Sequence, residues 1–140
     1  MAGSAGAHLV TRMLNINFIV EQGVAILPYI QAGKVKVLAT TGMQRSAVLP
    51  DVPTLNETVA PGFDAYAWYA LYAPSGISPA IQKQLNADVN KSFTTSEIKK
   101  RFLDIGAEVA VSTSNELAEF QKNETVKWGA IVRNAGIQPD

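Results

Sequence analysis

The sequence contains no cysteine and only one histidine, His8. The first absence excludes disulfide bonds, thiolate nucleophiles and cysteine-ligated metals. A single histidine gives little basis for a histidine-dependent triad or a multi-histidine metal site. The Gly-x-Ser-x-Gly pattern of many serine hydrolases is missing as well. We therefore expect a protein that is not an enzyme and that needs neither a metal nor a cofactor.

Long hydrophobic runs and an excess of charge of one sign are also missing. No apolar stretch reaches the ~20 residues that a membrane span requires. The first eight residues lack the basic and apolar regions of a signal peptide, which predicts a cytoplasmic location if this chain is the full gene product. Twelve basic and twelve acidic residues give a formal net charge of zero. This balance predicts no nucleic-acid partner and no direct insertion into a membrane.

What the sequence does contain is a clear set of signals for the ends of helices. Thr54 with Glu57, and Thr113 with Glu116, fit capping boxes. Ser78 before Pro79 marks another helix start. Glycines after apolar stretches mark helix ends. The predicted helices cover 4–14, about 25–32, 54–59, 79–93, 96–105 and 113 to about 135.

Short segments rich in branched or aromatic residues lie between these helices and predict strands. The predicted strands are 15–20, 35–41, 63–73 and 107–111. Alternating strands and helices indicate the α/β class, with a mixed sheet flanked by helices. Only about four strands are predicted, and several of them are apolar on both faces. This number of strands is small for the packing that such faces require. In the helix over 96–105, we expect Ile98, Phe102 and Ile105 to be buried.

Among the scattered carboxylates, Glu21 stands out by its position. It lies at the predicted carboxyl end of a strand and just before a helix, where open α/β sheets bind ligands. A solvated loop residue is the plainer alternative. The aromatic tract 66–72 fits either a ligand wall or, for most of its members, core packing. The Gly-Ser-Ala-Gly opening at 3–6 leaves free backbone N–H groups that attract anions, or it is simply a flexible end.

Taken together, these segments resemble the extracytoplasmic solute-binding receptors of the tripartite tricarboxylate transporter family, the Bug-type receptors. Each motif alone is weak, whereas their shared order along nearly the whole chain is specific. Two positions depart from the family pattern. The family usually has Asp at the position of Glu21, and it often has Pro at the position of Gly6. The matching segments are Gly3-Ser4-Ala5, Val20-Glu21, 27–34, Arg45-Ser46, 49–54, Pro61-Gly62-Phe63, 68–74, Leu85-Asn86, 106–108, Trp128-Gly129 and Ala135-Gly136-Ile137.

The resemblance implies half of a periplasmic-binding-protein-like fold, in which two α/β lobes close like a Venus flytrap. Residues 1–63 would correspond to the C-terminal half of the second lobe, 64–74 to a crossover strand, and 75–140 to the C-terminal part of the first lobe. The two parts would pack as one domain or be completed by a second chain.

The resemblance also implies a receptor, or a piece of one, that binds a small carboxylate and works with the membrane subunits of a transporter. By family, its location would be periplasmic. The ligand-binding residues that carry over are Gly3, Ser4, Ala5 and Glu21. An alternative is an orphan half-receptor that has lost ligand capture and acts as a self-associating or protein-binding homodimer. We expect an intertwined or strand-exchanging homodimer, because exposed strand edges and apolar faces need cover.

Overall fold

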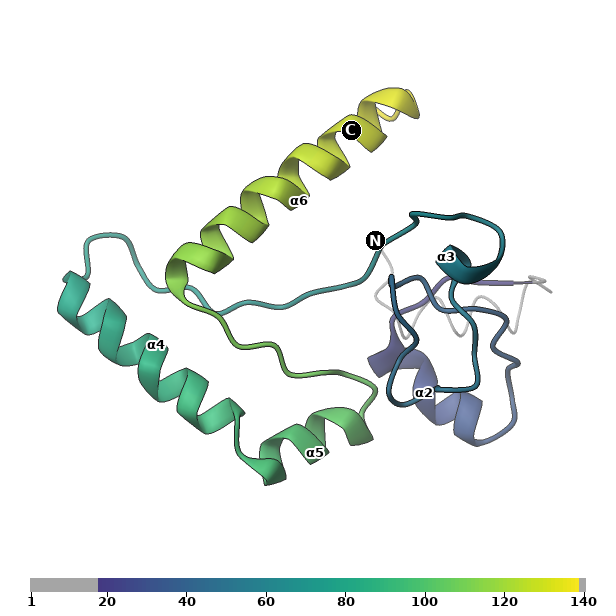
Figure 1. The fold of residues 1–140 in the computed structure, drawn as a ribbon, viewed down its shortest axis with the longest axis horizontal. Helices are drawn as coiled ribbons and strands as arrows, with labels where there is room; N and C mark the ends of the chain where they lie inside the picture. The colour runs from purple at the N-terminus through teal and green to yellow at the C-terminus, as the bar shows by residue number, and fades with distance from the viewer. Residues whose placement is uncertain (1–17, 139–140) are drawn as a thin grey trace. The chain divides into compact units, whose positions relative to one another are not determined.

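A computed structural model of the chain describes residues 18–138 (Figure 1). The described helices are α2 (Gly23–Gln31), α3 (Leu55–Thr58), α4 (Pro79–Phe93), α5 (Ser96–Asp104) and α6 (Ser114–Asn134). The contacts divide the chain into two units. The first unit holds the described residues up to Tyr72 together with Ser96–Glu108, and the second holds Ala73–Thr95 with the described residues from Val109 onward. The predicted helix over 4–14 lies outside the described residues.

In the first unit, α2 begins two residues earlier than the sequence predicts, at Gly23, with Gln22 as its N-cap. We expected a start near Ala25 because Pro28 would then fall in the first turn. Pro28 instead lies inside the helix, where proline removes one backbone hydrogen bond. The C-terminal end follows the prediction, since Gly33 adopts φ +65° and its N–H donates to the carbonyl of Ile30.

The glycine at the end of α5 fixes a close backbone approach within the same unit. Gly106 has φ +82°, and a Cβ at this position would lie 3.1 Å from both the C and O atoms of Gly23 and 3.3 Å from Cδ2 of Leu27. A Cβ on Gly23 would lie 2.8 Å from the Gly106 carbonyl oxygen. Leu27 is the one buried large apolar side chain among the described residues. The two glycines therefore let the start of α2 meet the segment after α5.

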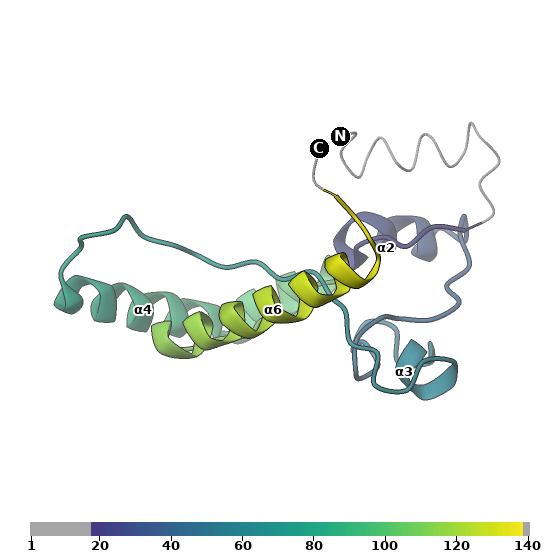
Figure 2. The ribbon, with the colours of Figure 1, turned by 90° about the horizontal axis from the view of Figure 1, so that it is seen from above.

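The second unit is built from α4 and α6, both of which begin where the sequence predicts. Ser78 caps α4 through its hydroxyl, which accepts the N–H of Ile81, and Thr113 with Glu116 forms the predicted capping box of α6. Figure 2 shows α6 as one uninterrupted helix. The predicted α6 ending is confirmed by Gly136, at φ +65°.

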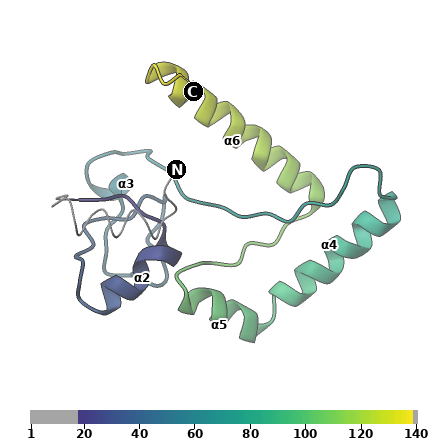
Figure 3. The ribbon, with the colours of Figure 1, turned by 180° about the vertical axis from the view of Figure 1, so that it is seen from behind.

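The predicted strands are not assigned as strands in the part of the chain that the structure describes. One isolated parallel bridge joins Thr40 to Thr54, and the predicted strands 35–41, 63–73 and 107–111 form no ladder. Only residues 18–20 of the first predicted strand are described. A strand requires a neighbour that exchanges backbone hydrogen bonds with it, and the described residues do not supply one. Figure 3 shows the open chain that leads into α6.

Burial is also lower than the sequence predicts. Ile105, expected to be buried, is 53% exposed, whereas Ile98 and Phe102 are half-buried. The apolar spacing of α5 therefore predicts the less exposed positions Ile98 and Phe102 better than it predicts Ile105. Spacing reports which residues share a face, and it does not report whether that face has a partner.

Candidate functional site

The first candidate site lies at the start of α2. Glu21 is partly exposed, and its Oε1 accepts a hydrogen bond from the backbone N–H of Gln22 over 2.9 Å. The carbonyl of Gln22 accepts from the N–H groups of Ala25 and Ile26. A carboxylate at this end of a helix is favoured by the helix dipole. The same end presents N–H groups of the first turn that no intrahelical carbonyl can satisfy.

A second side chain reaches this point from the aromatic segment after α3. The hydroxyl of Tyr69 donates to Oε1 of Gln22 over 2.6 Å, across 47 positions in the sequence. Tyr69 remains 75% exposed, so this hydroxyl ties an otherwise open segment to the N-terminus of α2. The arrangement places an acidic oxygen, an amide and a phenol together on one partly exposed surface of the first unit.

Of the four predicted ligand-binding residues, the structure describes only Glu21. Gly3, Ser4 and Ala5 lie outside the described residues, so the structure does not test whether they meet Glu21. Gln22 and Tyr69 were not singled out from the sequence. The sequence indicates the aromatic tract 66–72 as a ligand wall or as core packing. Its spacing does not predict which of its aromatic side chains contacts the start of α2.

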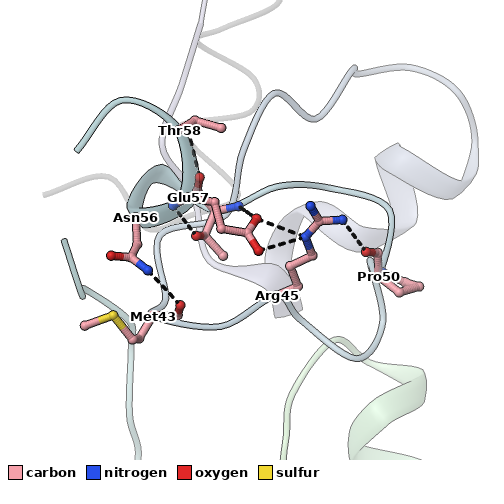
Figure 4. A network of polar contacts seen from close by, with 7 residues as sticks. Met43, Arg45, Pro50, Asn56, Glu57 and Thr58 are labelled. Carbon is pink, nitrogen blue, oxygen red and sulfur yellow. Dashed lines mark hydrogen bonds and ion pairs between the residues drawn. The ribbon is translucent and has the colours of Figure 1, made fainter. Parts of the chain in front are cut away.

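A polar network surrounds α3 and organises the loop that precedes it (Figure 4). The guanidinium Nε of Arg45 lies 2.9 Å from Oε2 and 3.1 Å from Oε1 of Glu57, and Nη1 of Arg45 donates to the carbonyl of Pro50. Oε2 of Glu57 also accepts the N–H of Thr54, while the Thr54 hydroxyl accepts the N–H of Glu57. The Thr54 N–H, and then Arg45, hold the pKa of Glu57 below its ordinary value.

These contacts make the α3 network a structural rather than a binding feature. Each of its charged groups is already paired, and Thr54 is fully buried beneath them. Asn56 extends the network by donating to the carbonyl of Met43 and accepting the N–H of Gly62. The network therefore fixes the path of the loop, and it leaves the start of α2 as the better candidate in this unit.

The second unit contains a shallow pocket of about 360 Å³ between the N-terminal half of α4 and the start of α6. The capping signals at Ser78 and Thr113 predict both helix starts, but not that the two adjoin. Six of the eight residues that line the pocket are polar, and one of these, Lys83, is a cation. The lining residues are Pro79, Gln82, Lys83, Asn86, Ala87, Thr113, Ser114 and Asn115.

Two other kinds of feature are absent from the described residues. No group of three or more histidine, cysteine or acidic side chains among residues 18–138 is arranged to hold a metal ion. Within the same range, none of the helices is long and apolar enough to cross a membrane.

Comparisons with known proteins place these features in a family. Residues 3–137 match the model of the tripartite tricarboxylate transporter family receptor. A Pseudomonas knackmussii protein, described as a UPF0065 protein in the clcB-clcD intergenic region, is 33% identical over 129 residues, which are 91% of this chain and 75% of the relative. The description of the matching model makes this a family of receptors.

Two solved structures extend the likeness to the fold. Rpa4515 of R. palustris, solved with adipate, superposes on all of this chain with a TM-score of 0.89 and 25% identity. MatC (Rpa3494) from Rhodopseudomonas palustris, with bound malate, covers 94% of this chain with a TM-score of 0.75 and 31% identity. This chain spans about half of each, 47% and 46%.

The structural matches confirm the predicted fold class, an α/β chain that forms half of a two-lobe binding-protein fold. The relatives give no support to the alternative of a self-associating orphan. With a family match from residue 3 to residue 137, the chain belongs to the receptors of the tripartite tricarboxylate transporter family.

Proposed function

We propose that this chain is part of a solute-binding receptor that recognises a small carboxylate for uptake. The observation that carries the proposal is the pair of carboxylate-bound structures on which the chain superposes, one with adipate and one with malate. Both superpositions cover nearly the whole chain, so the likeness is not confined to one motif. The receptor would work in the periplasm and deliver its ligand to transporter membrane subunits.

The ligand site would combine backbone N–H groups of Gly3, Ser4 and Ala5 with the side chain of Glu21. Backbone N–H groups suit a carboxylate because they donate hydrogen bonds without a competing charge. The carboxylate of Glu21 repels a ligand carboxylate, so it would face a ligand hydroxyl or amine, from which it can accept a hydrogen bond. Of the two ligand types bound by the relatives, malate, a hydroxy acid, therefore fits better than adipate.

The proposal also includes the predicted division of the chain between the two lobes of the receptor. Residues 1–63 would belong to the second lobe, 64–74 would cross between the lobes, and 75–140 would belong to the first lobe. The second unit of the structure begins at Ala73, close to the proposed end of the crossover. A ligand held between two lobes would be sequestered when they close.

A thermal-shift titration with malate, adipate, citrate and acidic amino acids tests the function. At 100 times its dissociation constant, a ligand should stabilise the folded chain by about 2.7 kcal/mol. A saturable shift with at least one carboxylate is the expected result. A cooperative melt that no member of the panel displaces would contradict carboxylate binding by this chain.

Two glutamate variants locate the site. Glu21→Gln should weaken binding of a hydroxy acid more than binding of a plain dicarboxylate, because it removes the charged acceptor but keeps the size of the side chain. Glu119→Gln is the matched control, since Glu119 lies on the exposed side of α6 and only approaches Lys122. Equal affinities for all three proteins would remove Glu21 from the site.

A further inference from the structure

The start of α2 is held at three points within the first unit. The backbone N–H of Gln22 donates to Oε1 of Glu21 over 2.9 Å, and Oε1 of Gln22 accepts the hydroxyl of Tyr69 over 2.6 Å. The backbone of Gly23 packs so closely on Gly106 that an added Cβ would lie 2.8 Å from the Gly106 carbonyl oxygen. The side chains at this point therefore begin from a fixed backbone, which a precise binding site requires.

The side chain of Gln22 does not serve the helix that it precedes. An N-cap side chain ordinarily accepts an N–H of the first turn, but Gln22 makes no such bond. Its carboxamide has one oxygen acceptor and one NH2 group with two donors. The oxygen is taken by Tyr69, and the NH2 group makes no hydrogen bond within residues 18–138. The Tyr69 hydroxyl thus decides which end of the amide is left for another molecule.

Glu21 and Gln22 together offer one acceptor and one donor at the surface. Oε1 of Glu21 is turned back onto the N–H of Gln22, so this carboxylate lies within one side-chain length of the Gln22 amide. Oε2 of Glu21 accepts no hydrogen bond within the described part of the chain. A hydroxy acid carries the complementary pair, a hydroxyl that donates and a carboxylate that accepts. Its hydroxyl can face Glu21 while its carboxylate meets the neutral amide.

We propose that Gln22 is a further ligand-binding residue, whose NH2 group donates to a carboxylate oxygen of a hydroxy acid held at Glu21, and that Tyr69 is the positioning residue that orients this amide. The assignment rests on the proposed function of the chain as a carboxylate receptor. Without the phenol, the amide can flip and present its oxygen to the ligand carboxylate, which repels it. Tyr69 therefore acts on the ligand only through Gln22.

The exposure of the pair favours positioning over stabilisation. Tyr69 is 75% exposed, and Gln22 is exposed as well. A hydrogen bond in contact with water contributes little to folding, because water offers both groups equivalent partners. The contact nevertheless joins residues 47 positions apart and commits the amide to one orientation. Its main effect is on the direction of the donor, and less on the stability of the fold.

Titration calorimetry of the full chain with malate tests the donor. Gln22→Glu keeps an oxygen that accepts from Tyr69 but replaces the NH2 group with a second oxygen and a charge. The dissociation constant should rise by about tenfold or more, since a hydrogen bond to a charged group is lost and repulsion replaces it.

Gln31→Glu is the matched control, because it places the same charge at the other end of α2. The two positions are about 13 Å apart along the helix axis. This separation exceeds the screening length of about 8 Å at physiological salt, so the affinity for malate should stay within about twofold of the parent chain.

Tyr69→Phe separates positioning from a purely structural role. In the parent chain it should raise the dissociation constant for malate by about threefold, because the amide must then be ordered on binding. In the Gln22→Glu background the phenol still has an acceptor, but no donor remains to be oriented. Tyr69→Phe should have no further effect there. A structural tether would instead give the same loss in both backgrounds.

The outcomes separate this assignment from the proposed function. A loss in Gln22→Glu that Gln31→Glu does not share, with Tyr69→Phe effective only in the parent chain, supports it. It is overturned if Gln22→Glu binds malate as the parent does, if both glutamates cause equal losses, or if Tyr69→Phe has no effect in the parent or equal effects in both backgrounds. In each of these cases the parent still binds malate, so the receptor function stands. A parent chain that binds no carboxylate of the panel overturns both.

Discussion

Tyr69 and Gln22 meet through a 2.6 Å hydrogen bond although 47 positions separate them in the sequence. This bond joins the aromatic segment after α3 to the N-cap of α2, next to the carboxylate of Glu21. No backbone ladder holds the same segment in the described residues. The Tyr69 hydroxyl therefore holds the aromatic segment against the start of α2, where no backbone ladder does so among the described residues.

Tyr69→Phe removes this bond and keeps the ring. We expect a fall of about 0.5 to 1 kcal/mol in the free energy of unfolding, toward the lower end of hydrogen-bond contributions because the pair is exposed. Urea unfolding followed by fluorescence measures the change. Tyr66→Phe is the control, since the Tyr66 hydroxyl makes no hydrogen bond within residues 18–138. Equal stability of the two variants would mean that the Tyr69 bond contributes nothing.

Gly106→Ala should destabilise the chain more than Gly62→Ala does. Both glycines have a positive φ, +82° and +83°, so both variants carry the strain of a left-handed alanine, about 1 kcal/mol. Only at Gly106 does the added Cβ meet neighbours, at 3.1 Å from Gly23, whereas Gly62 has open space within 4 Å. Chemical denaturation of the two variants side by side isolates the cost of the contact.

Thr113→Ala should cost about 1 kcal/mol because it removes the hydroxyl that caps α6. The N–H of Glu116 loses its acceptor at 3.2 Å, and the carboxylate of Glu116 loses one of the two Thr113 donors that it contacts. Thr113→Ser retains the hydroxyl and should remain near the parent in stability. Far-UV circular dichroism during urea unfolding checks both variants, and a Ser variant as weak as the Ala variant would argue against capping.

Acid should weaken both capping boxes. The Thr54 N–H and Arg45 lower the pKa of Glu57, and the N–H and hydroxyl of Thr113 lower the pKa of Glu116, each from an ordinary 4.5. A lowered folded-state pKa stabilises the fold above pH 4.5, and this contribution is lost as the pH falls through the lowered value. Unfolding midpoints should therefore stay level from neutral pH down to the unfolded pKa and then drop. The double variant Glu57→Gln/Glu116→Gln should show a smaller drop.

The helices could be predicted because their ends depend on neighbouring residues. Thr113 and Glu116 lie within one turn, so the sequence contains the whole capping interaction. The start of α2 was missed because Pro28 was expected to remain in the first turn, whereas the helix tolerates it inside. The ends marked by Gly33, Gly106 and Gly136 followed from glycine's access to positive φ.

Pairing and burial could not be predicted in the same way. The segment 35–41 has the composition of a strand, but a ladder depends on what lies beside it, and only Thr40 forms a bridge. Ile105 continues the apolar spacing of α5 just beyond its end, yet it is 53% exposed, because spacing along the chain does not determine which faces are covered. For the candidate site, position alone identified Glu21. The Tyr69–Gln22 contact spans too much sequence to leave a local signal.

The contact between Gly23 and Gly106 has a consequence for the order of folding. The first unit contains both glycines, and Ala73–Thr95 of the second unit lies between them in the chain. During synthesis, the start of α2 leaves the ribosome before Gly106, the residue whose backbone packs against it. The contact can form only after α4 and α5 have been synthesised. Closing so long a loop carries an entropic cost that local helix formation does not. Completion of the first unit is therefore a late event, limited by the arrival of Gly106 rather than by the formation of α2.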